Sequence, residues 1–225
     1  MSITTTTGVH ILVYPYPTSG HIIPLLDLTQ RLLSRDLTVT ILVTLTTSLL
    51  LEPYLSTHPS SLKQLVLPAP SPDIFCPPQK RIVSNVRAIR DLHYPMLLQW
   101  FQSQSSPPMA IISDFFLGWT RHLASELGVP RIGFSPSGAF ALSVGFSMCR
   151  DPHEPDDPED LNFQVSFPKI PNSPVYPWWQ IPPHVRCFRG DPDKEFYMSN
   201  ILDNAASWGL LFNSFVELER VYFDH

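Results

Sequence analysis

The sequence has few cysteines, and they form no motif. Only three occur among its 225 residues, and Cys76, Cys149 and Cys187 are widely and irregularly spaced. A disulfide framework or a structural zinc site needs several cysteines at short, regular intervals. We therefore expect a reducing, cytoplasmic environment and neither kind of site.

Basic runs and membrane-length hydrophobic runs are also missing. Lysine and arginine total 15 against 20 acidic residues, and they are scattered along the chain. A net charge of -5 argues against nucleic acid or an anionic membrane as the main partner. The most apolar stretch, residues 37–51, contains five threonines and is too short to span a membrane. The N-terminus lacks the positive charge of a signal peptide.

Several motifs of nucleotide-binding proteins, hydrolases and metalloproteins are absent. Neither the dinucleotide fingerprint G-x-G-x-x-G nor the P-loop pattern occurs. Ser135 and Ser137 lie in a segment without the final glycine of a nucleophile elbow, and Pro136 would obstruct its sharp turn, which argues against a serine hydrolase. The eight histidines form no His-x-x-x-His pair, so we expect no metal.

Strand and helix patterns alternate over the first 150 residues. Short segments rich in Val, Ile and Thr predict strands at residues 9–13, 37–44, 64–67, 109–113 and 131–135. Apolar residues at helical spacing predict helices at 20–34, 47–57, 84–104, 117–127 and 137–149. This alternation predicts an α/β fold, a Rossmann-like parallel sheet with helices on both faces.

The pattern lapses at residues 151–192, which contain many of the 25 prolines. We expect a loop-rich insertion there, followed by a helix near 193–205 and a strand at 209–213. Ser214 and Glu217 then have the spacing of a capping box, which predicts the start of another helix. Because that helix has barely begun at His225, we expect a truncated product.

His21 and Asp114 are the strongest candidates for catalysis. His21 follows the first predicted strand and Asp114 follows a later one, and the carboxyl ends of parallel strands meet at one edge of a sheet. A carboxylate beside an imidazole holds its tautomer and stabilises the imidazolium, so the pair would act as a general base. The alternative is that each residue only caps the helix that follows it.

Two further groups of residues could bind ligands. Thr18, Ser19 and Gly20 precede a helix and could contact a phosphate through hydroxyl groups and the helix N-terminus. An ordinary tight loop is the alternative for these three. Several aromatic residues could form an apolar pocket, with core or lid packing as the alternative. They are Phe115, Phe116, Trp119, Phe140, Trp178 and Trp179.

Three segments resemble the conserved regions of plant UDP-dependent glycosyltransferases of small molecules, and they occur in the same order across the whole chain. The first is Pro15-x-Pro17-x-x-Gly20-His21-Ile22-x-Pro24-Leu25-Leu26-x-Leu28. The second is Ile112-Ser113-Asp114-Phe115-Phe116-Leu117-Gly118-Trp119-Thr120 with Leu127-Gly128-Val129-Pro130, and the third is Phe212-Asn213-Ser214-Phe215-x-Glu217-Leu218-Glu219. Among these enzymes, the chain most resembles those that glucosylate flavonols and simple phenolics.

The resemblance implies the N-terminal, acceptor-binding domain of a GT-B fold over residues 1–225, without the C-terminal sugar-nucleotide domain. It implies inverting transfer of a hexose, glucose in most relatives, from a UDP-sugar to a hydroxyl of a small phenolic or flavonoid. His21 maps onto the family's catalytic base and Asp114 onto its partner. No metal or other cofactor is implied, and Thr18, Ser19 and Gly20 map onto the loop near the donor phosphates.

The resemblance also implies an acceptor pocket, to which we assign Phe115, Phe116, Trp119, Ser137 and Phe140. Some features depart from the family. The signature that binds the sugar nucleotide is missing, and Asp36 replaces a common glycine. We therefore expect the chain alone to be inactive, and a non-catalytic remnant that binds small molecules is the alternative function.

Overall fold

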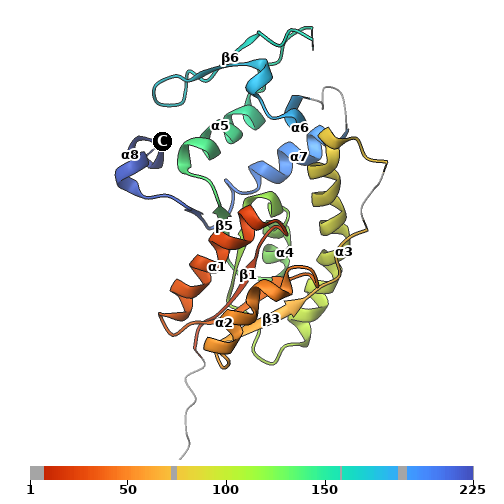
Figure 1. The fold of residues 1–225 in the computed structure, drawn as a ribbon, viewed down its shortest axis with the longest axis vertical. Helices are drawn as coiled ribbons and strands as arrows, with labels where there is room; N and C mark the ends of the chain where they lie inside the picture. The colour runs from red at the N-terminus through yellow and green to blue at the C-terminus, as the bar shows by residue number, and fades with distance from the viewer. Residues whose placement is uncertain (1–7, 72–74, 158, 187–191, 225) are drawn as a thin grey trace, which may run out of the picture.

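A six-stranded parallel sheet forms the centre of the protein (Figure 1). The computed structural model describes residues 8–71, 75–157, 159–186 and 192–224. Every neighbouring pair of strands in this sheet is parallel. Their order is β3 (Leu62–Val66), β2 (Thr38–Val43), β1 (His10–Tyr14), β4 (Ala110–Asp114), β5 (Arg131–Ser135) and β8 (Gly209–Phe212). The expected α/β fold is confirmed.

Helices cover both faces of the sheet because alternate strand residues point in opposite directions. In β1, Ile11 and Val13 belong to a core that includes residues of α1 (Ser19–Leu33). Leu12 and Tyr14 belong instead to a second core with α3 (Arg81–Ser103) and α4 (Thr120–Leu127). The short helices η1 (Ser48–Leu51), α2 (Glu52–Thr57) and η2 (Pro78–Lys80) complete this part of the chain.

Two turns show why particular residues stand between these elements. Asp36 links α1 to β2 with a positive φ of 61°, which aspartate tolerates better than most residues. Gly128 ends α4 with a φ of 68° in the left-handed region, where glycine has no steric cost. The predicted ends of both helices are therefore confirmed.

The described residues between 151 and 186 contain more regular structure than the loop-rich insertion we expected at 151–192. They contain a small antiparallel hairpin of β6 (Gln164–Ser166) and β7 (Val175–Pro177), followed by η4 (Trp178–Gln180) and α6 (Pro183–Arg186). This hairpin lies beside α5 (Ala139–Arg150), away from the sheet (Figure 1). The segment forms its own apolar core, which a search for regular periodicity cannot detect. Its buried members are Val165, Phe167, Ile170, Trp178 and Ile181.

The predicted capping box at Ser214 and Glu217 is wrong. The last helix, α8 (Val216–Phe223), is preceded by Phe215 and has no side-chain cap. Glu219 departs from helical geometry and accepts the backbone N–H groups of Ala139 and Phe140, at 3.0 and 3.2 Å. The carboxylate of α8 thus caps the start of α5, where the helix dipole favours a negative charge.

Glu219→Gln is expected to lower the free energy of unfolding by about 1 kcal/mol at pH 7. The neighbouring Ser214 hydroxyl and the Phe140 and Ala139 N–H groups lower the pKa of Glu219 in the folded chain. Its stabilisation is therefore complete above the unfolded pKa of about 4.3 and is lost as pH falls through the lower folded value. Urea denaturation at pH 7 and pH 3 measures this effect. Glu217→Gln, at an exposed position of the same helix, is the control, and equal losses in the two variants would contradict the assignment.

No helix in the part of the chain that the structure describes is both long enough and apolar enough to cross a bilayer. The remaining helix, α7 (Pro192–Leu202), packs against α5 and η3 (Phe115–Leu117). Because η3 directly follows β4, these contacts connect the carboxyl edge of the sheet to α5 and α7.

Candidate active site

His21 lies in the first turn of α1, at the carboxyl edge of the sheet. Three aromatic rings surround its imidazole, with centroid distances of 5.4 Å to Tyr16, 5.9 Å to Phe115 and 5.0 Å to Phe116. These rings fix the plane of the imidazole, yet 17% of the side chain stays exposed. His21 is therefore held in place while one part of its ring can be reached by a ligand.

Asp114 is the last residue of β4, and its side chain is completely buried. Its Oδ2 atom lies 2.7 Å from Nδ1 of His21, and its Oδ1 atom accepts the Phe116 N–H at 2.9 Å. Burial raises the pKa of Asp114. The hydrogen bond and charge of His21, the Phe116 N–H and the charge of Arg131 oppose that rise. The carboxylate therefore both contacts His21 and caps η3.

This contact determines what the imidazole can do. When Nδ1 donates its proton to Asp114, the other ring nitrogen, Nε2, is an acceptor. Among the residues that the structure describes, none forms a hydrogen bond with Nε2 of His21. The arrangement can accept a proton from a hydroxyl group placed at Nε2, and Asp114 would stabilise the resulting imidazolium.

Thr18, Ser19 and Gly20 are exposed at the start of α1, next to His21. Thr18 occupies the N-cap position, but its side chain makes no capping hydrogen bond. A Cβ atom added to Gly20 would meet nothing within 4 Å. The hydroxyl groups and the N-terminal N–H groups of α1 are thus open to a ligand, although this geometry does not identify one.

A cavity of about 250 Å³ lies next to the rings that stack on His21. Phe115 and Phe116 line it, whereas His21 and Asp114 are not among its lining residues. The walls are mainly apolar and come from η3, α5, the hairpin, η4, α6 and α7. Representative lining residues are Phe115, Ala141, Val144, Met148, Phe167 and Trp178.

The structure places the five residues assigned to the acceptor pocket in two different environments. Phe115, Phe116 and Ser137 line the cavity. Trp119 does not: it is 3% exposed and packs edge-on to Tyr14 at 6.0 Å in the core beneath α3 and α4. Phe140 also lies outside the lining, because its ring packs on Tyr222 of α8 at 4.8 Å. Trp119 and Phe140 thus lie outside this cavity, and the acceptor assignment of the other three residues stays a prediction.

Of the other two tryptophans, Trp178 lines the cavity and is 4% exposed, whereas Trp179 is 54% exposed and points elsewhere. The two residues are adjacent in η4, and adjacent side chains of a 3-10 helix point about 120° apart, so they do not both face the same cavity. The sequence pattern does not reveal which of the two does so.

Sequence reasoning missed the polar residues of the cavity wall. His184 lies 3.0 Å from the Tyr197 hydroxyl through its Nε2 atom, and burial lowers the pKa of His184. Lys194 and Glu154 form an ion pair at the same cavity. Their signal in the sequence is weak, because they come from separate segments of a region without periodicity. A search of the described residues finds no group of three His, Cys, Asp or Glu side chains that could hold a metal ion.

Comparison with known proteins places this arrangement in a family. No family model matches the chain. Over 97% of its length, however, the chain is 48% identical to UDP-glycosyltransferase 89B2 of Stevia rebaudiana. The chain belongs to the plant UDP-glycosyltransferase family. It is also 40% identical to flavonol 3-O-glucosyltransferase UGT89B1 of Arabidopsis thaliana over 97% of its length, and it spans about half, 48%, of each relative.

Solved structures of relatives confirm the GT-B N-terminal fold. The structure of Arabidopsis thaliana UGT89C1 complexed with UDP-L-rhamnose superposes with a TM-score of 0.71 at 27% identity. That match covers 97% of this chain and 48% of the other. The complex of the same protein with quercetin gives a TM-score of 0.68 at 29% identity, covering 95% and 45%. The family and fold that the sequence resemblance implied are therefore confirmed.

Proposed function

We propose that the chain is the acceptor-binding domain of a UDP-sugar-dependent glycosyltransferase, with residues 1–225 forming one half of the enzyme. In the complete enzyme it transfers a hexose, glucose by preference, to a hydroxyl of a phenolic or flavonoid acceptor, with inversion. The observation that carries this proposal is the open Nε2 of His21 beside an apolar cavity. Phe116 contacts the imidazole and also lines the cavity.

The chemistry assigned to the site follows from that geometry. His21 removes the proton of the acceptor hydroxyl through Nε2, and the resulting oxygen attacks the anomeric carbon of the sugar as UDP departs. Asp114, 2.7 Å from Nδ1, stabilises the positive charge that develops on the imidazole. Attack from the side opposite the leaving group inverts the anomeric configuration.

The acceptor class follows from the walls of the cavity. Aromatic and aliphatic side chains suit a flat aromatic molecule, and a few polar groups can orient its hydroxyls. Quercetin, the ligand in the UGT89C1 complex, has this chemistry. Thr18, Ser19 and Gly20 are assigned to the donor phosphates, and the UDP-L-rhamnose complex of the same relative supports a UDP-sugar donor.

Calorimetry of quercetin binding to the chain tests the assignment of the cavity to the acceptor. Gly145→Leu is expected to weaken binding at least about tenfold, because Gly145 lines the cavity and nothing lies within 4 Å of its added Cβ. Ser147→Leu, a change in the same helix at a position outside the lining, serves as the matched control. Equal affinities of the Gly145→Leu and unaltered chains would contradict the assignment. Binding without transfer in a completed enzyme would favour the non-catalytic alternative.

A further inference from the structure

Arg131, at the start of β5, is a buried cation that contacts the backbone of Asp114, the partner of the candidate base. Only 2% of the residue is exposed, although arginine is seldom buried without a charged partner. Its side chain runs along the sheet toward the end of β4. Gly133 leaves room for it, since a Cβ there would lie 2.9 Å from Nη1 of Arg131.

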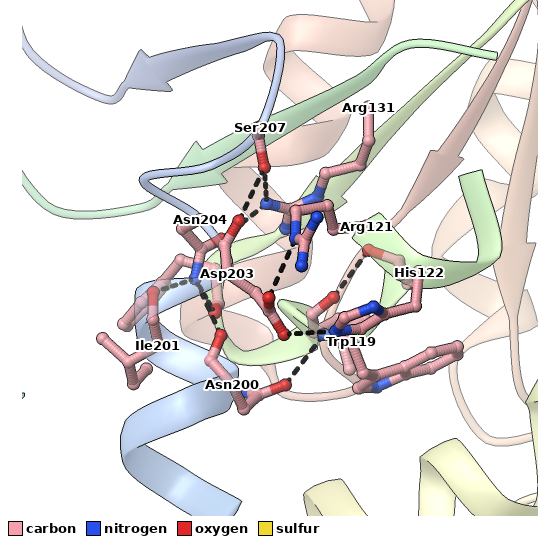
Figure 2. Close-up of polar contacts among 12 residues, drawn as sticks. Trp119, Arg121, His122, Arg131, Asn200, Ile201, Asp203, Asn204 and Ser207 are labelled. Atoms are coloured by element: carbon pink, nitrogen blue, oxygen red, sulfur yellow. Dashed lines mark hydrogen bonds and ion pairs between the residues drawn. The ribbon is translucent and has the colours of Figure 1, made fainter. Parts of the chain in front are cut away.

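All five N–H donors of the guanidinium have acceptors, and every acceptor is a neutral oxygen. Figure 2 shows the part of this network that joins Arg131 to the end of α7 and the following turn. The distances are 2.9 Å from Nε to Ser113 Oγ, 2.7 Å from Nη1 to Asn204 Oδ1 and to Ser207 Oγ, and 3.3 and 3.2 Å from Nη2 to the carbonyls of Ser113 and Asp114.

The hydrogen bonds of Arg131 therefore leave its charge unneutralised. Burial lowers the pKa of Arg131 to about 9, and the charges of Asp114 and Asp203 oppose that fall. Asp203 is already held by Arg121 at 2.8 Å and His122 at 3.0 Å (Figure 2). Asp114 is bonded to His21, but among the described residues no arginine or lysine forms an ion pair with its carboxylate.

Asp114 is a buried negative charge, as Arg131 is a buried positive one. Its carboxylate is fully buried, and its hydrogen bonds come from the Phe116 N–H and from His21, which must be neutral to act as a base. Tyr16 also lies beside Asp114, and its phenol is neutral at pH 7. A buried carboxylate in this setting takes up a proton unless a positive charge lies close by.

We propose that Arg131 is a positioning residue for the His21–Asp114 pair. It holds the backbone carbonyls of Ser113 and Asp114 in place, and its positive charge keeps the buried Asp114 carboxylate ionised beside His21. Arg131 acts through Asp114 and does not itself contact the acceptor. This inference rests on the proposed role of His21 and adds a residue that none of the three family segments contains.

The charge state of Asp114 tests the inference without any transfer reaction. Aspartate labelled with ¹³C at Cγ reports ionisation by NMR, and Asp114→Asn identifies the signal of Asp114. We expect the carboxylate of the unaltered chain to be ionised at pH 7. In Arg131→Met, which removes the charge, its titration midpoint rises by about one pH unit or more, whereas Arg131→Lys restores most of the difference.

Arg121→Met is the matched control, because it disturbs the same network through Asp203 and leaves Arg131 in place. It is expected to leave the Asp114 midpoint unchanged. A protonated Asp114 at pH 7 in the unaltered chain would overturn the inference. So would a midpoint that Arg131→Met does not move, or that Arg121→Met moves equally.

If Arg131→Met does not fold, Arg131→Gln takes its place, since the glutamine amide can still donate to Asn204 or Ser207. The measurement on the unaltered chain needs no Arg131 variant, only Asp114→Asn to identify the signal. Failure of the proposed function would show as lost quercetin binding or transfer. Such a loss leaves the charge state of Asp114 unaffected, so the two failures are distinguishable.

Discussion

His21→Ala is expected to lower glycosyl transfer by about 10²–10⁴-fold, the usual contribution of a general base. The enzyme for this measurement joins residues 1–225 to the second half of UDP-glycosyltransferase 89B2, the Stevia relative that is 48% identical to the chain. Steady-state kinetics with UDP-glucose and quercetin give kcat and KM. The decrease should appear in kcat, because the variant removes the base while most of the apolar cavity remains.

His122→Ala is the control for this experiment. His122 lies on α4 with 54% of its side chain exposed, and it bonds to Asp203, away from the cavity. Its replacement should leave kcat within about twofold of the unaltered enzyme. Full activity of His21→Ala, or an equal loss in both variants, would remove His21 from the role of base.

Gly118→Ala is expected to destabilise the fold by about 3 kcal/mol, because the added methyl group has no space. A Cβ at Gly118 would lie 1.7 Å from the carbonyl oxygen of Asn200 in α7. The backbone just after η3 thus packs directly on the backbone of α7. Both elements line the cavity, η3 through Phe115 and Phe116. Either segment must shift to admit the methyl group.

Urea denaturation measures this change in the free energy of unfolding. Gly145→Ala is the control, since nothing lies within 4 Å of a Cβ at that position of α5. It should raise stability by about 0.5–1 kcal/mol, the usual gain for alanine over glycine inside a helix. A loss below about 0.5 kcal/mol in Gly118→Ala would show that the contact between η3 and α7 yields easily.

The sheet and the contact between His21 and Asp114 were predictable from local patterns. The central strands β1, β2 and β4 are short segments rich in Ile and Val. Parallel strands bring their carboxyl ends to one edge however far apart they lie in sequence. Asp114 thus reaches a histidine 93 positions away. The contact required only the two strand positions, and the family resemblance then supplied a reaction.

The walls of the cavity were harder to predict because they depend on the direction of individual side chains, within helices as well as between them. Trp119 follows Phe116 by three positions but points into the core, and the ring of Phe140 turns toward Tyr222. The expected capping pair at the start of α8 does not form. Glu219, where α8 departs from helical geometry, caps the start of α5 instead. In each case a tertiary contact determined the outcome, and the local sequence contains no sign of its partner.

Arg131 illustrates a third situation, in which the sequence contains a signal that is informative only after folding. An arginine at the start of an otherwise apolar strand, with glycine two residues later on the same face, suggests a buried cation given space by that glycine. Its acceptors come from β4 and from the turn after α7, so no local motif unites them.

A crystal structure of the chain with quercetin tests most directly whether His21 can act as the base. We expect quercetin to fill the cavity beside α5 and to place one hydroxyl oxygen within about 3 Å of Nε2 of His21, the distance that proton transfer requires. Quercetin bound in that cavity with every hydroxyl beyond hydrogen-bonding reach of His21, or bound only outside the cavity, would contradict it.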